Sequence, residues 1–145
     1  MSIDCYTKAD PRRIFDLAGN LADDLGESSA YHHRSGVYRD AVSPELPSLP
    51  DHWHERLIKV ERAGARACFL EPNDAALSKY VRGEPRDRQW IKAGLLAGVV
   101  SMPVVKSRLG TTNFTDHDEE SKARKLVGED RLWFRVIQDQ RKLTV

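Results

Sequence analysis

The sequence predicts an α+β fold, in which a small mixed or antiparallel sheet is packed with helices and is followed by a helical C-terminal half. Segments that alternate polar and apolar residues, as strands do, lie before Pro72. After Pro72 the apolar residues recur at helical spacing, and glycines and prolines separate the runs. The chain of 145 residues is 40% hydrophobic, which is enough to bury one core.

Four segments are expected to be strands. Ser2–Tyr6 alternates polar and apolar residues, and Val37–Val42 is a short run of similar character. Arg56–Glu61 and Ala65–Leu70 flank a turn that contains Gly64, which predicts an antiparallel hairpin. We expect these strands to form one small mixed sheet.

Capping residues mark the expected helices. Asp10 and Pro11 can begin a helix that Gly26 stops, and Asn73 or Asp74 can cap a helix closed by Gly83. Further helices are expected to begin at three later residues: Pro85, Ser101 and Thr115, the last running through Leu126. Leu132, Trp133, Val136 and Ile137 continue helical spacing to the end. We therefore expect an α+β domain over residues 1–110 and a C-terminal helical extension over residues 111–145.

Composition restricts the classes of partner and compartment. Lys plus Arg total 23 and Asp plus Glu 22, so a net charge of +1 argues against nucleic acid as a general partner. The two cysteines, Cys5 and Cys68, cannot form a disulfide framework, and we expect both to pack as small hydrophobic residues. Met1 is followed by polar and acidic residues, and the longest apolar stretch, Ala93–Val100, is too short to span a membrane. We expect a cytoplasmic protein.

Lys79 and Asp87 are the first candidates for chemistry. Asp87 lies one helical turn before Ile91, which places a carboxylate at the N-terminal end of an apolar face. Such a carboxylate is partly screened from water. The structural alternative is that Asp87 is an acid favoured by the helix dipole and Lys79 a solvated surface lysine.

The segment around these residues resembles a known group of enzymes. Asp74-x-x-x-x-Lys79 followed by Pro85-Arg86-Asp87 is similar to the second half of minimal nucleotidyltransferases related to AbiEii-type toxins. Glu71–Arg88 is similar to a bacterial nucleotidyltransferase-like family described only as a domain of unknown function. Ser2–Tyr6 resembles the carboxylate-bearing strand of that family, and the resemblance covers residues 2 to about 110.

The resemblance implies Mg²⁺-dependent transfer of a nucleotide from a nucleoside triphosphate to a hydroxyl group. Carried onto this sequence, Asp4 is the metal carboxylate, Lys79 contacts phosphate and Asp87 is the late acidic residue, and these three form the catalytic set. Ser78 and Arg86 are the implied substrate-binding residues.

The sequence also departs from the pattern of that family. The paired Asp-x-Asp appears as Ser2-x-Asp4 or Asp4-x-Tyr6, and Asn73 stands where the family has histidine. The phosphate-binding Gly-Ser turn is expected upstream of a strand with which this chain begins. A single carboxylate holds Mg²⁺ poorly. We therefore expect an N-terminally truncated, degenerate relative that is inactive or needs a partner chain, and that belongs to a toxin-antitoxin or defence system.

The C-terminal segment supports a second class of function. Trp133, Phe134 and Ile137 could supply an apolar helix face that docks a protein partner or a second copy of the chain. The chain would then be a small binding protein, such as an antitoxin or an inhibitor of phage or mobile-element type. The histidines at 32, 33, 52 and 54 are expected to be packing or surface residues, because His52 and His54 could share a metal only on an extended strand.

Overall fold

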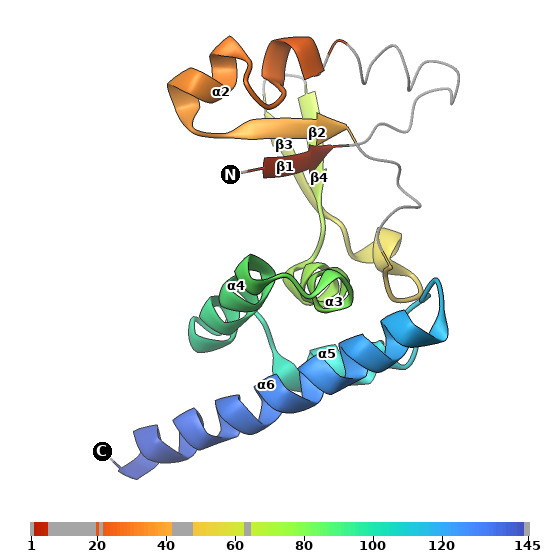
Figure 1. The fold of residues 1–145 in the computed structure, drawn as a ribbon, viewed down its shortest axis with the longest axis vertical. Helices are drawn as coiled ribbons and strands as arrows, with labels where there is room; N and C mark the ends of the chain where they lie inside the picture. Colours follow the sequence, from red (N-terminus) through yellow and green to blue (C-terminus); the bar gives the residue numbers. More distant parts are fainter. Residues whose placement is uncertain (1, 6–19, 21, 42–47, 63–64, 144–145) are drawn as a thin grey trace. The chain divides into compact units, whose positions relative to one another are not determined.

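The computed structural model describes residues 2–5, 20, 22–41, 48–62 and 65–143 (Figure 1). The chain divides into two compact units, Met1–Pro47 and Ser48–Val145, and each unit is described by itself. In the described part of the chain, strands occur only before Pro72, and helices dominate the residues after it. The predicted α+β class with a helical C-terminal half is thereby confirmed.

The first unit contains a parallel pair of strands. β1, Ser2–Cys5, pairs with β2, Tyr38–Ala41, and the register aligns Asp4 with Asp40. Both strands lie within segments that the alternating pattern predicts. Parallel strands need a crossover connection, so the pairing depends on the intervening chain as well as on the strands themselves.

A short helix, α2 at Ala30–Ser35, precedes β2 and was not expected. The hydroxyl of Ser29 accepts a hydrogen bond from the backbone N–H of His32 at 3.1 Å, and Gly36 ends the helix with φ 68°. The segment lacks an apolar period, and these two caps are its only local signal. The helix expected from Asp10 lies largely outside the described residues, although residues 22–25 are helical.

The expected hairpin is confirmed in the second unit. β3, Ile58–Arg62, pairs antiparallel with β4, Ala65–Phe69, and Ile58 lies opposite Phe69. In the described part of the chain, the parallel pair and the hairpin are separate two-stranded sheets, whereas one mixed sheet was expected. Alternation in the sequence identifies strands but leaves their partners open, and strands adjacent in sequence pair most readily. Cys68, which was expected to pack as a small hydrophobic residue, is exposed on β4.

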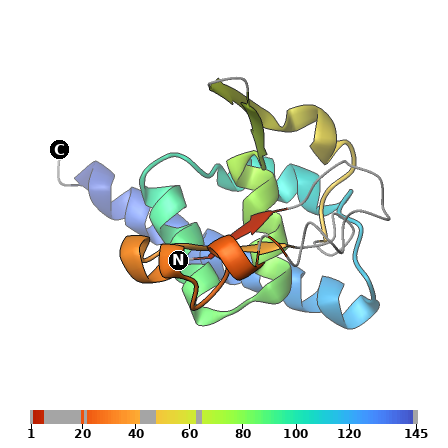
Figure 2. The ribbon, with the colours of Figure 1, turned by 90° about the horizontal axis from the view of Figure 1, so that it is seen from above.

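Helices dominate the rest of the second unit (Figures 1 and 2). They are the 3₁₀ helix η1 at Trp53–Arg56, α3 at Pro72–Arg82, α4 at Pro85–Leu96, α5 at Met102–Leu109 and α6 at His117–Leu143. None of the helices in the described residues is both long and apolar enough to cross a membrane.

Two predicted helix starts differ from the structure. α3 begins two or three residues earlier than expected, because Pro72 occupies its first turn and Glu71 is the cap, accepting a hydrogen bond from the N–H of Asn73 at 3.2 Å. At the start of α6, Asp116 rather than Thr115 caps the helix, with its Oδ1 2.8 Å from the N–H of Glu119. The two C-terminal helical stretches form one continuous helix.

The core of the second unit lies among α3, α4, α5 and α6. Tyr80, Ile91 and Val105 are completely buried there. α6 passes across the other three helices and contributes Ala123 and Val127 to the same core (Figure 1). The segment predicted as a C-terminal extension therefore packs against the helices that carry Lys79 and Asp87.

Candidate functional site

Asp4, the expected metal carboxylate, lies on β1 and is paired in register with Asp40 on β2. Residues at paired positions of neighbouring strands share one face of a sheet, and the strands lie about 4.8 Å apart. The register therefore places two aspartate positions side by side. Asp40 was missed because its relation to Asp4 is tertiary, although its place within a predicted strand was an available signal.

Lys79 and Asp87 are brought together in the second unit at the junction of α3 and α4. Nζ of Lys79 lies 3.4 Å from Oδ1 of Asp87, whose side chain is 1% exposed. The glycine turn at Gly83, with φ 68°, brings the end of α3 next to the start of α4. The predicted burial of Asp87 is confirmed.

Arg82, which the sequence did not single out, binds Asp87 more closely than Lys79 does. Its Nε donates to Oδ2 at 2.7 Å and its Nη2 donates to Oδ1 at 2.6 Å, which is a bidentate pair. These hydrogen bonds lower the pKa of Asp87, burial opposes them, and Lys79 adds to the lowering. Because Asp87 is held as a carboxylate, it is suited to orient cations rather than to act as a proton donor.

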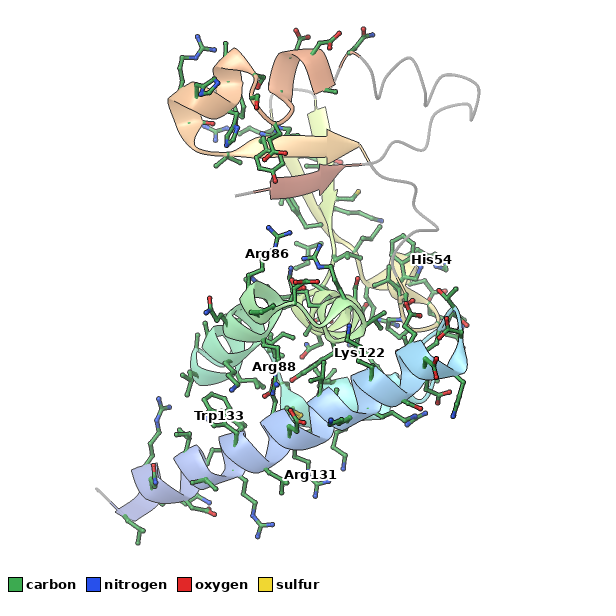
Figure 3. The ribbon with its side chains drawn as sticks, in the orientation of Figure 1. His54, Arg86, Arg88, Lys122, Arg131 and Trp133 are labelled. Carbon is green, nitrogen blue, oxygen red and sulfur yellow. The ribbon has the colours of Figure 1, made fainter. Side chains whose placement is uncertain are left out.

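Ser78 and Arg86, the expected substrate-binding residues, flank this pair. Ser78 is half-buried on α3, and Arg86 is exposed near the start of α4 (Figure 3). Arg86 forms no ion pair with any residue that the structure describes. Lys79 and Arg82 both contact the Asp87 carboxylate, and Arg86 precedes Asp87 on α4, so these residues give the junction an excess of positive charge that is suited to an anion.

Comparison with known proteins identifies the family of the chain. Residues 1–141 match a family described as a nucleotidyltransferase of unknown function, DUF6036. The chain belongs to this family. The expected resemblance is thus confirmed at the level of a nucleotidyltransferase-like protein. No solved structure matches the chain.

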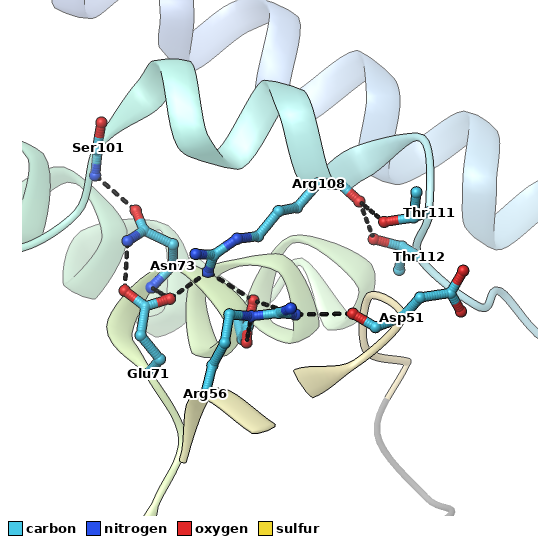
Figure 4. A network of polar contacts seen from close by, with 9 residues as sticks. Asp51, Arg56, Glu71, Asn73, Ser101, Arg108, Thr111 and Thr112 are labelled. Carbon is cyan, nitrogen blue, oxygen red and sulfur yellow. Dashed lines mark hydrogen bonds and ion pairs between the residues drawn. The ribbon is translucent and has the colours of Figure 1, made fainter. Parts of the chain in front are cut away.

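Part of the sequence motif in this nucleotidyltransferase-like protein is committed to holding α3 in place (Figure 4). Asp74 is completely buried and accepts from Arg56 Nε at 2.8 Å and from Arg108 Nη1 at 2.8 Å. Arg108 also donates to Glu71. Burial raises the pKa of Glu71, but hydrogen bonds from Arg108 and Asn73 outweigh it and leave that pKa below its ordinary value. Asp74 is thus engaged in packing η1 and α5 against α3.

Asn73, where the resembling family has histidine, also has a structural role. Its Oδ1 accepts a hydrogen bond from the N–H of Ser101 at 2.7 Å, which satisfies a backbone donor at the start of α5. Ser101 precedes that helix as predicted, although its own side chain makes no capping hydrogen bond.

A third polar cluster joins α6 to α4, close to Tyr80 of α3. Asp130 is completely buried and accepts from Arg88 Nη2 at 2.5 Å, and Arg88 lies between α4 and α6 (Figure 3). The hydroxyl of Tyr80 is buried without a hydrogen-bond partner among the described residues. Burial and the charge of Asp130 raise the pKa of Tyr80.

The aromatic residues expected to dock a partner are half-buried. Trp133 and Phe134 pack against the core of the second unit, and Lys92 Nζ lies 4.8 Å from the centroid of the Trp133 ring. Ile137 is also half-buried. The more exposed apolar residues of this half of α6 are three others: Leu132 at 64%, Val136 at 55% and Leu143 at 88% exposure.

Proposed function

We propose that this nucleotidyltransferase-like chain binds a nucleoside triphosphate with one Mg²⁺ ion and does not transfer the nucleotide unaided. The observation that carries the proposal is the register pairing of Asp4 with Asp40. It supports a second aspartate position for the metal, paired in register with the position of Asp4 on β1.

The chemistry of the donor set fits Mg²⁺. This ion prefers oxygen ligands, is commonly bound through one or two carboxylates, and keeps several waters or substrate phosphate oxygens. Two aspartates at paired positions on one sheet face match that requirement. Metal-dependent transfer in two-metal enzymes needs a second ion about 3.5–4 Å from the first. The strand of Asp4 carries one aspartate where the family pattern has two, so the proposal assigns this chain one ion and weak or absent transfer.

Within the second unit, the basic cluster at the α3–α4 junction is suited by itself to contact phosphate. Lys79 is the principal one, because its ammonium is anchored by Asp87 and its side chain remains 29% exposed. Arg86 adds an exposed guanidinium, and Ser78 a neutral hydroxyl. Asp87 acts through Lys79 as a positioning residue. When bound, Mg²⁺ would supply neutralisation of phosphate charge, while these side chains bind and orient the ligand.

Calorimetric titration with each nucleoside triphosphate tests the proposal, with and without Mg²⁺. We expect Mg²⁺-dependent binding that Asp4→Asn and Asp40→Asn each abolish and that Asp139→Asn, an exposed control on α6, leaves unchanged. Absence of heat at millimolar nucleotide would overturn nucleotide binding. Transfer of labelled nucleotide by the purified chain, abolished by Asp4→Ala, would overturn the proposed inactivity.

A second candidate function is protein binding, of the kind an antitoxin or inhibitor performs. The observation in its favour is the exposed apolar set Leu132, Val136 and Leu143, which recurs at helical spacing on α6. In this alternative a toxin-like partner or a second copy of the chain covers that face. The resemblance to AbiEii-type toxins then suggests a toxin-antitoxin system as the biological setting. Light scattering across a concentration series tests the homodimer. A monomer at all concentrations, unchanged by Leu132→Glu, would exclude self-association.

A further inference from the structure

Lys79 lies between a carboxylate and an indole ring. Its Nζ is 3.4 Å from Asp87 Oδ1 and 5.2 Å from the centroid of the Trp90 ring. Asp87 and Trp90 are three residues apart on α4, so they project from the same side of that helix. Lys79 reaches them from α3, across the turn at Gly83.

The carboxylate alone does not determine the position of Lys79. Asp87 is already paired with Nε and Nη2 of Arg82 at 2.7 and 2.6 Å, closer than its contact with Lys79. A lysine ammonium is a point charge on a flexible four-carbon stem, so a single long contact leaves it several orientations. The face of an indole ring attracts a cation and removes some of that freedom.

Exposure separates this arrangement from a buried packing contact. The Lys79 side chain is 29% exposed and Trp90 is 40% exposed, so an anion can reach the ammonium.

An equivalent arrangement occurs at Lys92, whose Nζ lies 3.7 Å from Asp130 and 4.8 Å from the Trp133 ring centroid. That second arrangement joins α4 to α6, and it lacks the neighbouring Ser78 and Arg86. It therefore serves as an internal control.

We propose that Trp90 is a positioning residue for Lys79, confining its ammonium beside Asp87 for contact with a polyphosphate. The inference rests on the proposed function, because it takes Lys79 as the phosphate-contacting lysine. It adds the residue that orders this lysine before the ligand arrives, so that binding does not have to restrict a freely moving side chain. The ligand class is a nucleoside triphosphate or inorganic tripolyphosphate.

The geometric part is tested by NMR of the lysine side chains. Ring currents of Trp90 are expected to shift the ε-methylene signal of Lys79 away from the values of exposed lysines. Trp90→Leu should return that signal to the ordinary value. A Lys79 signal that Trp90→Leu leaves unmoved would overturn the proposal, and this measurement needs no nucleotide binding.

The functional part is tested by the affinity for inorganic tripolyphosphate and for Mg²⁺–ATP. Losing a partly exposed cation–π contact corresponds to about two- to fivefold weaker binding in Trp90→Leu. Trp90→Phe, which keeps an aromatic face, should retain part of the affinity. Lys79→Met should weaken binding more, whereas the matched control Lys92→Met should not. Circular dichroism confirms that each variant is folded.

The double variant separates positioning from a merely structural effect. In the Lys79→Met background, Trp90→Leu should cause no further loss, because the residue acts only through Lys79. An equal loss in both backgrounds, or unchanged affinity in Trp90→Leu, would overturn the inference. If the unaltered chain binds neither ligand, the proposed function fails instead, and the NMR measurement alone decides whether Trp90 positions Lys79.

Discussion

Arg108 on α5 donates a hydrogen bond at 2.8 Å to Asp74 on α3, whose side chain is completely buried. The guanidinium of Arg56, 2.8 Å away on the other side, completes the neutralisation of that carboxylate. A buried carboxylate is costly unless it is paired and hydrogen-bonded. The pairing therefore fixes how η1 and α5 pack against the helix that carries Lys79.

Replacing Asp74 should strongly destabilise the second unit. Asp74→Ala leaves Arg56 without its carboxylate partner and Arg108 with Glu71 as its remaining anion, and breaking a buried pair in this way costs about 3–5 kcal/mol. The two arginines are 26% and 24% exposed, so solvent moderates the loss and we expect the lower end. Urea unfolding measures it. Glu120→Ala, which breaks the exposed pair with Arg124, is the control and should change stability by less than about 0.5 kcal/mol.

Acid should destabilise the chain partly through Asp87. Hydrogen bonds from Arg82 lower the pKa of Asp87 below its ordinary value despite burial. A carboxyl group with a lower pKa in the folded state contributes stability above its unfolded pKa, and that contribution disappears as the pH falls through the folded pKa. The stability difference between the unaltered chain and Asp87→Asn should therefore be constant near neutral pH and should shrink below about pH 4. Thermal unfolding across this range measures it, and a difference independent of pH would contradict the assignment.

Local signals predicted the helices that present the site, but not the contacts that hold it. Gly83 ends α3 as expected, because only a residue that tolerates positive φ closes the helix there. The capping of α3 by Glu71 differs from the prediction, since Asn73 and Asp74 are engaged with α5 and η1 instead. Those engagements join residues far apart in sequence, which no periodicity reveals.

The same limit applies to the metal and lysine positions. Asp4 could be predicted from its strand, whereas its partner Asp40 depends on which strands pair and in what register. Lys79 and Asp87 were expected together, but Arg82 and Trp90 complete the cluster only after α3 and α4 fold against each other. The capping residues of α2 could be seen in the sequence, but the helix itself could not be predicted, because six residues without apolar spacing are too few for a periodic pattern.

Tyr80 and Asp130 should respond differently to substitution, although both are completely buried. The hydroxyl of Tyr80 has no hydrogen-bond partner among the described residues, so Tyr80→Phe removes an unsatisfied group and should change stability by less than about 1 kcal/mol in either direction. Asp130→Ala leaves Arg88 with only the more exposed Glu129 and should cost about 2–3 kcal/mol. Chemical unfolding measures the free energy of unfolding of both variants. A larger loss in Tyr80→Phe would show that the hydroxyl has a partner in solution.

Gly83 and Gly98 provide a matched test of how closely α6 packs against the end of α3. Both glycines have positive φ, 68° and 72°, so alanine at either position is strained by about 1–2 kcal/mol. A Cβ at Gly98 would meet nothing within 4 Å, whereas one at Gly83 would lie 2.7 Å from Cε of Lys122 and 3.0 Å from Cδ1 of Leu126. Gly83→Ala should therefore cost more than Gly98→Ala.

The larger loss of stability expected for Gly83→Ala originates in a contact with α6. Nζ of Lys122 donates to the backbone carbonyl of Arg82 at 2.5 Å, so a methyl group at residue 83 displaces this cation from the C-terminal end of α3. We expect an excess of about 1 kcal/mol for Gly83→Ala over Gly98→Ala, measured by urea unfolding. Adding Lys122→Ala should reduce that excess, because the crowding atom is gone, while Leu126 keeps part of it. Equal losses for the two glycine variants would mean that α6 does not approach the α3 end this closely in solution.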